Sequence, residues 1–481
     1  MEEKKLPPVA LAFVPLVILV VLLACVITAF GSDALSGASQ IALLATSACC
    51  ILLGLVMKTM HWEDFEQAVN KNVSGVSQAI LILLLIGAVG GSWMVSGIVP
   101  TMIYYGMQII NPHWFLVSSC LICAVVSVIT GSSWTTIATI GIALLGIGKA
   151  QGFGEGWIAG AIVSGAYFGD KISPMSETTV LASSTTGTPL FTHIRYMTYT
   201  TIPAFLVGLV VFTVVGLMFP AGEVQHTAAF SEGLERVFVL SPWLMVVPLI
   251  TGVMIVRRLP AVVILFCATL LACAAAVLVQ TRLIDHIAGC DYGLWMNRFR
   301  GVMILVYGST SLETGVPALN DLVATRGMAG MMSTVWLIFC AMIFGASMSA
   351  SGMIESIMRM FIRRARNTFS LVGSTVGVGL FMNIVCADQY LSLILTGNMF
   401  KDVYRRMGYE SRLLSRTTED AVTVTSVLIP WNSCGMTQSM VLGVPTLVYL
   451  PFCFFNYLSP VMTLIFAAVG YKIKRVPAAD R

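Results

Sequence analysis

Residues Gly165–Thr179 read GAYFGDKISPMSETT, and apolar sequence of membrane-spanning length lies on both sides of them. The stretch contains Asp170, Lys171 and Glu177. An ionisable side chain at the bilayer centre costs roughly 2.5–3.5 kcal/mol on insertion scales, so such groups usually face a protein-lined ion or substrate path. Pro174 lacks an amide hydrogen and disfavours helical geometry in the residue before it. We predict a broken helix whose freed backbone groups line a site at the membrane midplane; a short loop at the membrane surface is the alternative.

The composition places the whole chain in a membrane. Of its 481 residues 57% are hydrophobic and only 10% are charged, whereas a soluble domain carries about 25% charged residues. The twelve cysteines are scattered, mostly within apolar segments, which favours small buried side chains over a disulfide framework. The net charge of +4 follows membrane topology, so we expect membrane lipid rather than nucleic acid as a partner.

We predict an all-α polytopic membrane protein with ten spans of about 20 residues each. Eight are uninterrupted, near residues 9–30, 39–57, 78–98, 199–219, 238–256, 260–280, 331–352 and 445–470. Two more, near 156–190 and 418–441, are interrupted by polar motifs. Segments 113–149 and 368–400 are too short for two crossings. Each carries a polar motif in its middle, Thr130–Thr136 or Asn383–Tyr390, so we predict two re-entrant hairpins. We expect segment 281–330 to lie outside, on the membrane surface.

The distribution of basic residues orients this arrangement. With both hairpins returning to their own side and a cytoplasmic N-terminus, 20 of the 27 lysines and arginines face the cytoplasm, in accord with the positive-inside rule. They include the group Lys401, Arg405, Arg406, Arg412 and Arg416, and the terminal groups Lys4, Lys5, Lys472, Lys474, Arg475 and Arg481. We therefore expect a multi-pass protein of the cell inner (plasma) membrane with both termini in the cytoplasm.

The two halves of the chain share an order of polar interruptions. Ser96-Gly97 recurs as Ser351-Gly352 at a spacing of 351 − 96 = 255 residues, and Pro174 recurs as Pro430 at 430 − 174 = 256. Each half contains two spans, a short amphipathic segment (Trp62–Val73 or Pro317–Arg326), a third span, a hairpin, a broken span and a closing span. Five crossings per half is an odd number, so we predict two inverted repeats, residues 1–220 and 238–481, joined by an external linker at 221–237. Such repeats are typical of secondary transporters; chance similarity of apolar stretches is the alternative.

Four polar segments converge in this arrangement and supply the candidate site. They are Gly131–Thr136, Gly169–Thr179, Asn383–Ser392 and Glu419–Gly435. Carboxylates, hydroxyls, amides and freed carbonyls are hard oxygen ligands, which suit Na⁺. As cation- or proton-binding residues we predict Asp170, Asp388, Glu177 and Asp420. As lining residues we predict Ser132, Ser133, Thr135, Thr136, Lys171, Ser173, Ser176, Thr178, Asn383, Gln389, Thr425, Ser426, Asn432 and Ser433.

Asp170 and Asp388 are the leading carriers. Sodium and protons can compete for one buried carboxylate, and this competition is the minimum that antiport needs; we expect Na⁺ at both residues, held also by nearby hydroxyls and carbonyls. Alternatively, Lys171 could form a locking ion pair with Asp170 or Glu177. Asp420 could instead cap a helix, and we expect Glu419 at the surface. The hydroxyls of Ser132, Ser133, Thr135 and Thr136 could equally bond to nearby backbone carbonyls.

No catalytic motif accompanies these residues. The sequence has no P-loop, and Gly146-Ile-Gly148 lacks the third glycine of a dinucleotide fingerprint. The histidines lie at predicted span ends or in loops, where none can activate a serine at depth. We expect no enzyme activity and no cofactor besides the transported Na⁺ and H⁺.

The polar motifs resemble those of the NhaC family of sodium/proton antiporters, in the ion-transporter superfamily. The motifs that carry the resemblance are Gly131-Ser-Ser-Trp-Thr-Thr136, Gly165-Ala-Tyr-Phe-Gly-Asp-Lys-Ile-Ser-Pro174 with Ser176-Glu-Thr-Thr179, His193-Ile-Arg-Tyr196, Ala387-Asp-Gln-Tyr390 and Leu428-Ile-Pro-Trp-Asn432. The resemblance covers nearly the whole chain. Glu177 departs from it, because the family is expected to favour aspartate there, and the longer side chain could change ion selectivity.

The resemblance implies an elevator-type transporter, in which hairpins and broken spans move against a scaffold, and a homodimer. It also leaves the substrate open, because family members resemble malate/lactate antiporters and amino-acid carriers. Sodium/proton antiport is the first hypothesis. The second is Na⁺- or H⁺-coupled transport of a small organic acid or amino acid, with Lys171 or backbone amides holding its carboxylate. An arginine at depth would favour the second; none is predicted there.

Overall fold

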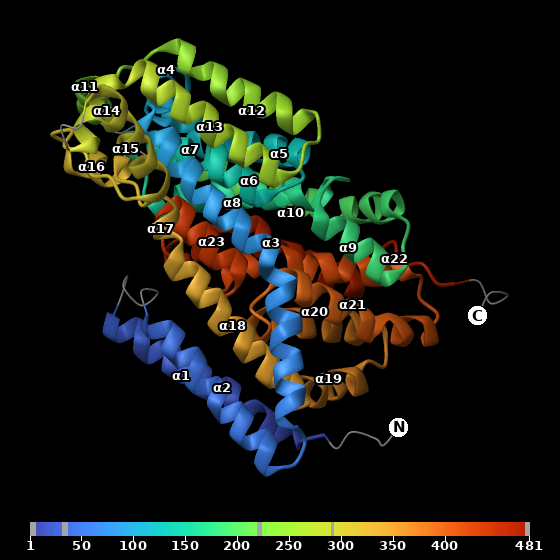
Figure 1. Ribbon diagram of the computed structural model, residues 1–481. Helices are drawn as coiled ribbons and strands as arrows, with labels where there is room; N and C mark the ends of the chain where they lie inside the picture. Colours follow the sequence, from blue (N-terminus) through green and yellow to red (C-terminus); the bar gives the residue numbers. More distant parts are fainter. Residues whose placement is uncertain (1–5, 31–36, 219–223, 290–292, 477–481) are drawn as a thin grey trace.

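The computed structural model describes residues 6–30, 37–218, 224–289 and 293–476, which form helices joined by short turns (Figure 1). The predicted basic residues Lys4, Lys5 and Arg481 and the first residues of the predicted linker lie outside these ranges. The helices of the first part are α1 (Val9–Phe30), α2 (Ala38–Val56), α3 (Trp62–Val95), α4 (Ile98–Ile109), α5 (Phe115–Thr130), α6 (Ser133–Thr136), α7 (Ile142–Ala150), α8 (Glu155–Ile172), α9 (Glu177–Thr186) and α10 (Leu190–Met218).

The helices of the second part are α11 (Val224–Val237), α12 (Val246–Val256), α13 (Ala261–Val279), α14 (Thr281–Ala288), α15 (Leu294–Tyr307), α16 (Pro317–Val323), α17 (Gly327–Gly330), α18 (Met332–Ala350), α19 (Met353–Arg364), α20 (Thr368–Val385), α21 (Gln389–Arg406), α22 (Ser411–Thr418), α23 (Ser433–Leu442), α24 (Thr446–Tyr449) and α25 (Phe454–Val469). The described part of the chain contains nine helices that are long and apolar enough to cross a membrane, or up to eleven if each of two bent helix pairs is one span. The prediction of an all-helical, multi-pass membrane protein is therefore confirmed.

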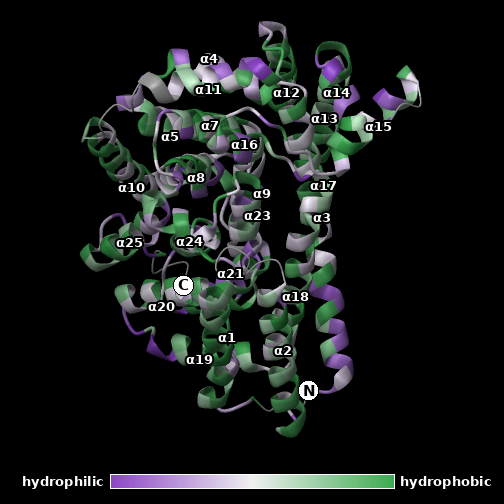
Figure 2. Cartoon of the chain, turned by 90° about the vertical axis from the view of Figure 1, so that its left-hand side faces the viewer, coloured by the Kyte–Doolittle hydropathy of each residue, from purple (hydrophilic) through white to green (hydrophobic). Residues whose placement is uncertain are grey.

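Helix α3 differs from its predicted form. We expected an amphipathic surface segment at Trp62–Val73 followed by a separate span, but one continuous helix of 34 residues covers both. The backbone amide of His61 donates to Asp64 at 2.9 Å and starts the helix, and no proline follows to end it. Its first turns are hydrophilic, whereas its later turns are more apolar (Figure 2). At 1.5 Å per residue the helix measures about 51 Å, against about 30 Å for a bilayer core.

The segment predicted as the first hairpin consists of two helical legs, Pro112–Thr130 and Ser133–Ala150, of 19 and 18 residues. By length and composition each leg is a candidate span, so leg length does not separate two crossings from one re-entrant hairpin, and the hairpin stays a prediction. Two crossings and one re-entrant hairpin both return the chain to its starting side, and the predicted orientation of later helices is unaffected. In the second such segment α20 qualifies as a span, whereas α21 carries four charged residues, Lys401, Asp402, Arg405 and Arg406.

Local backbone features recur at a fixed spacing in the two halves. The paired positions are turns in the left-handed region and side chains that cap the next helix. They are Gly97 and Gly352 (352 − 97 = 255), Gly131 and Ala387, Ser132 and Asp388, Ser176 and Asn432, and Gly187 and Gly443, the last four pairs each 256 residues apart. Ala387 is the one non-glycine among the left-handed members, with φ of 52°.

Helices from one half pack against the other half. Helix α2 lies against α18, α13 lies against α3, and α3 and α18 contact each other (Figure 1). Helix α1 packs on α2 and α19, and α12 packs on α13 and contacts α5. The second span of each predicted half thus packs on the third span of the other half, and the first span of each half packs on the second span of its own half.

Close packing of α5 on α8 holds the first break in place. A Cβ atom added at Gly165 would lie 2.0 Å from the carbonyl oxygen of Cys120, and one at Gly169 would lie 2.4 Å from that of Ala124. Small residues four apart let two membrane helices approach closely. The two glycines therefore fix the distance between α5, which leads into the α6 break, and α8, which carries Asp170.

We predict that Gly165→Ala destabilises the protein by about 1–3 kcal/mol, because the new methyl group forces α5 and α8 apart. The measurement is thermal unfolding of the purified protein in detergent. Gly75→Ala is the matched control, since nothing lies within 4 Å of a Cβ at Gly75. An unchanged melting temperature for Gly165→Ala would contradict this packing.

Candidate functional site

The break after α8 is built by three neighbouring residues. Ser173 is extended, with φ of −77° and ψ of 130°, and its hydroxyl donates to the carbonyl of Val128 at 2.8 Å. The chain resumes at α9, where the Ser176 hydroxyl accepts from the amide of Thr179 at 3.4 Å. Because Pro174 has no amide hydrogen to bury, the turn leaves few backbone donors to satisfy. The result places Asp170, in the last turn of α8, beside the start of α9.

Asp170 is buried and bonded by hydroxyl and amide groups. Its carboxylate accepts from the Ser133 hydroxyl at 2.7 Å, from the Ser133 amide at 3.2 Å and from the Ser176 hydroxyl at 2.6 Å. The Ser176 hydroxyl also lies 2.8 Å from that of Thr178. Only 5% of Asp170 is exposed, and no ion pair neutralises it in the described part of the chain. The predicted break of α8 and the tip before α6 thus meet at one carboxylate.

A second buried carboxylate, Asp388, lies at the tip in the second half, where it corresponds to Ser132 of the first half. It precedes α21, and its carboxylate accepts from the Leu391 amide at 2.9 Å and from the Ser433 hydroxyl at 3.1 Å. It is 3% exposed, and among the described residues no lysine or arginine pairs with it. Asp388 is therefore a second buried carboxylate whose partners are all neutral.

Amide side chains tie the second break together. Gln389 accepts from the Ser426 hydroxyl at 2.9 Å and from the Cys434 thiol at 3.0 Å. Asn383 donates to the Val422 carbonyl at 2.7 Å and to the Thr425 hydroxyl at 3.0 Å. In turn, the Asn432 side chain donates to the Asn383 carbonyl at 3.0 Å. These bonds satisfy backbone groups that the helix breaks release, so Asn383 and Asn432 act first as supports of the turn.

A tyrosine connects the two halves of the site. The Tyr390 hydroxyl donates to the Glu177 carboxylate at 2.9 Å, joining α21 to α9. Glu177 itself is exposed, in the first turn of α9, and does not contact Asp170 through a hydrogen bond. Of these predicted carboxylates, Asp170 and Asp388 are thus buried, whereas Glu177 is exposed and is linked to α21 by Tyr390.

Lys171 pairs with Asp420, rather than with Asp170 or Glu177, and both side chains of the pair are fully buried. Lys171 also donates to the Ser459 hydroxyl at 2.7 Å. Asp420 accepts in addition from Thr200 at 2.9 Å and from Thr463. This network joins α8, α10, α25 and the π-helical turn Glu419–Thr423. Asp170 and Lys171 are adjacent in sequence but belong to different polar clusters.

The remaining predicted hydroxyls mostly bond within their own turns. Thr136 donates to the Ser132 carbonyl at 2.9 Å, and Thr425 donates to the Ala421 carbonyl. The Ser132 hydroxyl accepts from the Thr135 amide and hydroxyl, each at 3.2 Å. Of the four predicted hydroxyls at the first tip, only Ser133 donates to a carboxylate.

The predicted position of Glu419 is wrong. We expected it at the surface, but its side chain is fully buried and neither carboxylate oxygen has a hydrogen-bond partner among the described residues. Lys171, Asp170, Thr178 and Thr423 are in its neighbourhood. The sequence does contain a sign of this burial. Glu419 lies within Thr417-Thr-Glu-Asp-Ala-Val-Thr423, where three hydroxyl residues surround the carboxylates and no lysine or arginine occurs.

Arg416 was also misplaced. We expected it in a cytoplasmic basic group, but its side chain is fully buried in α22, and none of its three guanidinium nitrogens has a hydrogen-bond partner in the described ranges. The guanidinium lies 4.6 Å from the centre of the Tyr196 ring and 6.0 Å from that of Phe466. Stacking on aromatic faces accounts for a buried arginine without a carboxylate partner.

Comparison with known proteins gives one family match and several relatives. A family model described as the Na⁺/H⁺ antiporter family matches residues 165–471. The Na⁺/H⁺ antiporter NhaC of Alkalihalophilus pseudofirmus is 35% identical over 424 residues, 88% of this chain and 89% of the relative. The malate-2H⁺/Na⁺-lactate antiporter of Bacillus subtilis is 33% identical over 433 residues, 90% of this chain and 89% of the relative. The arginine/ornithine antiporter ArcD of Halobacterium salinarum is 31% identical over 483 residues, 98% of this chain and 94% of the relative.

The matched region runs from the last turns of α8 through the α21 and α23 breaks to the end of α25, and so contains Asp170, Asp388, Glu419 and the Lys171–Asp420 pair. Both the family model and relatives of more than 30% identity that align over most of their own length point to the same assignment. The chain therefore belongs to the NhaC family of Na⁺/H⁺ antiporters.

Proposed function

We propose that this protein exchanges Na⁺ for H⁺ across the membrane and that Asp170 is the residue at which the two ions compete. The observation that carries the proposal is a buried carboxylate whose partners, Ser133 and Ser176, are neutral oxygen and nitrogen groups. A buried charge without a partner costs several kcal/mol. Binding either a proton or a sodium ion removes that cost. At every stage of the exchange the carboxylate therefore favours having one of the two ions bound.

The surrounding groups suit both ions. Hydroxyl oxygens of Ser133, Ser176 and Thr178 are hard ligands for Na⁺, and each can rotate its hydrogen away when the cation arrives or back toward the carboxylate when it leaves. Asp388, with Ser433 beside it, forms a second site in the second half. We propose that Na⁺ leaves the cell as H⁺ enters. If more protons than sodium ions move, the membrane potential contributes about 2.3 kcal/mol per net charge per 100 mV.

We assign different tasks to the other two buried acids. The charge of Asp420 is engaged by Lys171, which supports a structural lock between α8, α10 and α25. Glu419 has no such partner in the described part of the chain, and both Lys171 and Asp170 are in its neighbourhood. We propose that Glu419 delivers protons to the Asp170 site and removes them from it. This role needs a free carboxyl group close to hydroxyl groups.

The architecture we propose is that of an inverted-repeat transporter. Residues 1–220 and 238–481 form the repeats, with 221–237 as the external linker. Support comes from the five pairs of turns and caps at spacings of 255 or 256 residues and from the reciprocal packing of α2 on α18 and α13 on α3. We further propose re-entrant hairpins that move with the broken spans as an elevator, a midplane site, a homodimer, both termini in the cytoplasm, and the inner membrane as the location.

Coupled transport of a small organic acid or amino acid is the second candidate. It is motivated by the relatives named as malate-2H⁺/Na⁺-lactate and arginine/ornithine antiporters. Arg416 is a buried cation without a hydrogen-bond partner among the described residues, whereas the sequence predicts no arginine at depth. Lys171 is engaged by Asp420, so in this arrangement it is not the group that would receive a substrate carboxylate.

The transport assay uses proteoliposomes with an acidic lumen and an internal pH dye. We expect alkalinisation of the lumen when NaCl or LiCl is added outside without organic solute, and none with choline chloride. A response that requires malate, lactate or an amino acid would instead establish the second candidate.

Asp170→Asn should reduce this sodium-driven alkalinisation to the level of protein-free vesicles, because the amide keeps the size of the side chain but carries neither ion. Asp388→Asn should do the same. Asp402→Asn is the control, since Asp402 is exposed on α21. Transport that persists in Asp170→Asn while the melting temperature falls would make Asp170 a structural residue.

Removing one member of the Lys171–Asp420 pair should destabilise the protein by about 3–5 kcal/mol, because the remaining charge is buried and unpaired. Lys171→Met and Asp420→Leu together should recover much of that loss. The measurement is thermal unfolding in detergent, with Lys149→Met as control, since the more exposed Lys149–Glu155 pair should cost only about 0–1 kcal/mol. Single variants that unfold like the wild type would refute the lock.

Glu419→Gln should preserve the melting temperature and slow sodium-driven proton movement, because glutamine fills the same space but cannot pass a proton. The comparison is the initial rate of the pH change at several external pH values, against Glu63→Gln on the exposed first turn of α3. Equal rates for the two variants would remove Glu419 from the proton path.

A further inference from the structure

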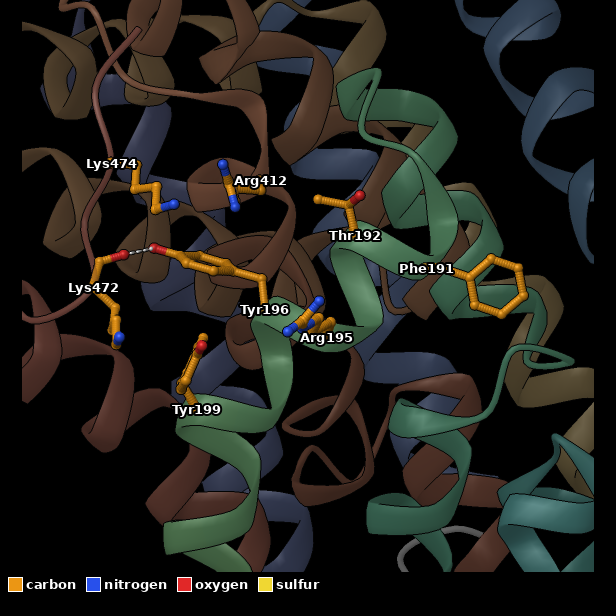
Figure 3. A pocket seen from close by; sticks show the side chains of 8 residues that line it. All are labelled: Phe191, Thr192, Arg195, Tyr196, Tyr199, Arg412, Lys472 and Lys474. Atoms are coloured by element: carbon orange, nitrogen blue, oxygen red, sulfur yellow. Dashed lines mark hydrogen bonds between the residues drawn. The ribbon is translucent and has the colours of Figure 1, made fainter.

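A cavity of about 510 Å³ lies beside the ends of α10, α22 and α25, apart from the carboxylate clusters. Four basic side chains line it, together with tyrosines: Arg195, Arg412, Lys472, Lys474, Tyr196 and Tyr199. In Figure 3 the basic groups surround the Tyr196 ring from different sides, with Lys472 and Lys474 on the C-terminal segment and Arg195 on α10. Among the residues that the structure describes, none that lines this cavity is acidic.

Most of this positive charge is uncompensated. Arg412 forms an ion pair with Glu410. Arg195, Lys472 and Lys474 have no ion pair in the ranges that the structure describes. The buried guanidinium of Arg416 lies behind the same Tyr196 ring and adds to the field. Several cations in one concave site attract an anion far more strongly than scattered surface lysines do.

The walls of the cavity are held by specific contacts. The Tyr196 hydroxyl donates to the Lys472 carbonyl at 2.8 Å, which fixes the C-terminal segment against α10 (Figure 3). The Val476 amide donates to the Gly408 carbonyl at 2.9 Å and secures the other end of that segment. His193, fully buried, bonds to Ser415 and ties α10 to α22. The motif His193-Ile-Arg-Tyr196, which the ion site does not use, therefore builds this cavity.

The location identifies the kind of anion. Helix α10 begins at Leu190 and α25 ends at Val469, and both are apolar helices of membrane type, so the cavity lies at the level where the apolar surface ends. The aromatic side chains of Phe191 and Tyr471 flank this level and are 75% and 50% exposed. Tyrosine and other aromatic residues beside basic groups are typical of the zone where lipid headgroups lie.

We propose that this basic cavity binds the phosphate group of an anionic phospholipid. Arginine and lysine provide charge-assisted hydrogen bonds to phosphate oxygens, and the exposed aromatic side chains lie where the glycerol and upper acyl chains would be. A soluble phosphate compound offers the same phosphate chemistry but would leave these aromatic groups without a partner. The cavity contains none of the residues assigned to ion exchange, so the proposal is independent of the transported substrate.

The test is the thermal unfolding of the full-length protein in detergent, titrated with phosphatidylglycerol, with phosphatidylcholine, or with inorganic phosphate. A ligand that binds the folded state raises the melting temperature as its concentration increases. We expect saturable stabilisation by phosphatidylglycerol and little by phosphatidylcholine. In Arg195→Gln/Lys472→Gln/Lys474→Gln we expect an apparent affinity for phosphatidylglycerol at least roughly tenfold lower.

The matched control is Arg363→Gln/Arg364→Gln/Arg366→Gln, which removes three exposed charges at the end of α19 and the turn after it and should keep the wild-type affinity. If the triple variant at the cavity does not fold, Lys474→Glu reverses one exposed charge and serves in its place. Equal affinities in cavity and control variants, or equal stabilisation by the two lipids, would overturn the proposal. Stabilisation by inorganic phosphate without any by phosphatidylglycerol would overturn the lipid assignment and indicate a soluble phosphate compound.

Discussion

Where a helix stops inside apolar surroundings, its free backbone groups must find partners within the protein, because lipid offers none. The breaks of this chain meet that constraint with short polar side chains: Ser132 and Ser176 cap α6 and α9, and Asp388 and Asn432 cap α21 and α23. The same side chains surround the buried carboxylates. A residue such as Ser176 both ends a stretch of irregular backbone and bonds to Asp170, so the structural requirement and the ion site are satisfied by one set of groups.

The neighbouring residues Asp170 and Lys171 serve two different tasks, ion exchange and helix packing. Successive helical positions point about 100° apart, and so Asp170 faces Ser133 and Ser176 while Lys171 faces Asp420. One acid is left with neutral partners and can exchange ions; the other acid is paired and holds three helices together. A chain with the pairing Asp170–Lys171 would have lost both the unpaired carboxylate at Asp170 and the link between α8 and the π-helical turn at Glu419–Thr423.

Much of the fold could be predicted from the sequence, because apolar length and the positions of Pro174 and Pro430 directly report spans and breaks. Helix α3 could not be divided correctly, since composition changes along it but no residue ends the helix. Among the site residues, Asp170 and Asp388 lie at the breaks as expected. Glu419 and Arg416 were misplaced because each lies close to basic residues in sequence. Only the packing of α22 on α10, α20 and α21, and of the π-helical turn on α20 and α25, shows that both are buried.

The left-handed residues at the two tips differ in one methyl group. Gly131 adopts its positive φ without steric cost, whereas Ala387 holds φ of 52° with its side chain fully buried, a conformation that costs of order 1–3 kcal/mol for a residue with a Cβ atom. The Ser433 amide, which donates to the Ala387 carbonyl at 2.8 Å, helps to hold it there. The two tips are therefore mechanically unequal. The glycine tip holds its conformation without this cost while Met175 packs closely against it. The alanine tip keeps a strained conformation that the hydrogen bond from Ser433, at the start of α23, helps to hold.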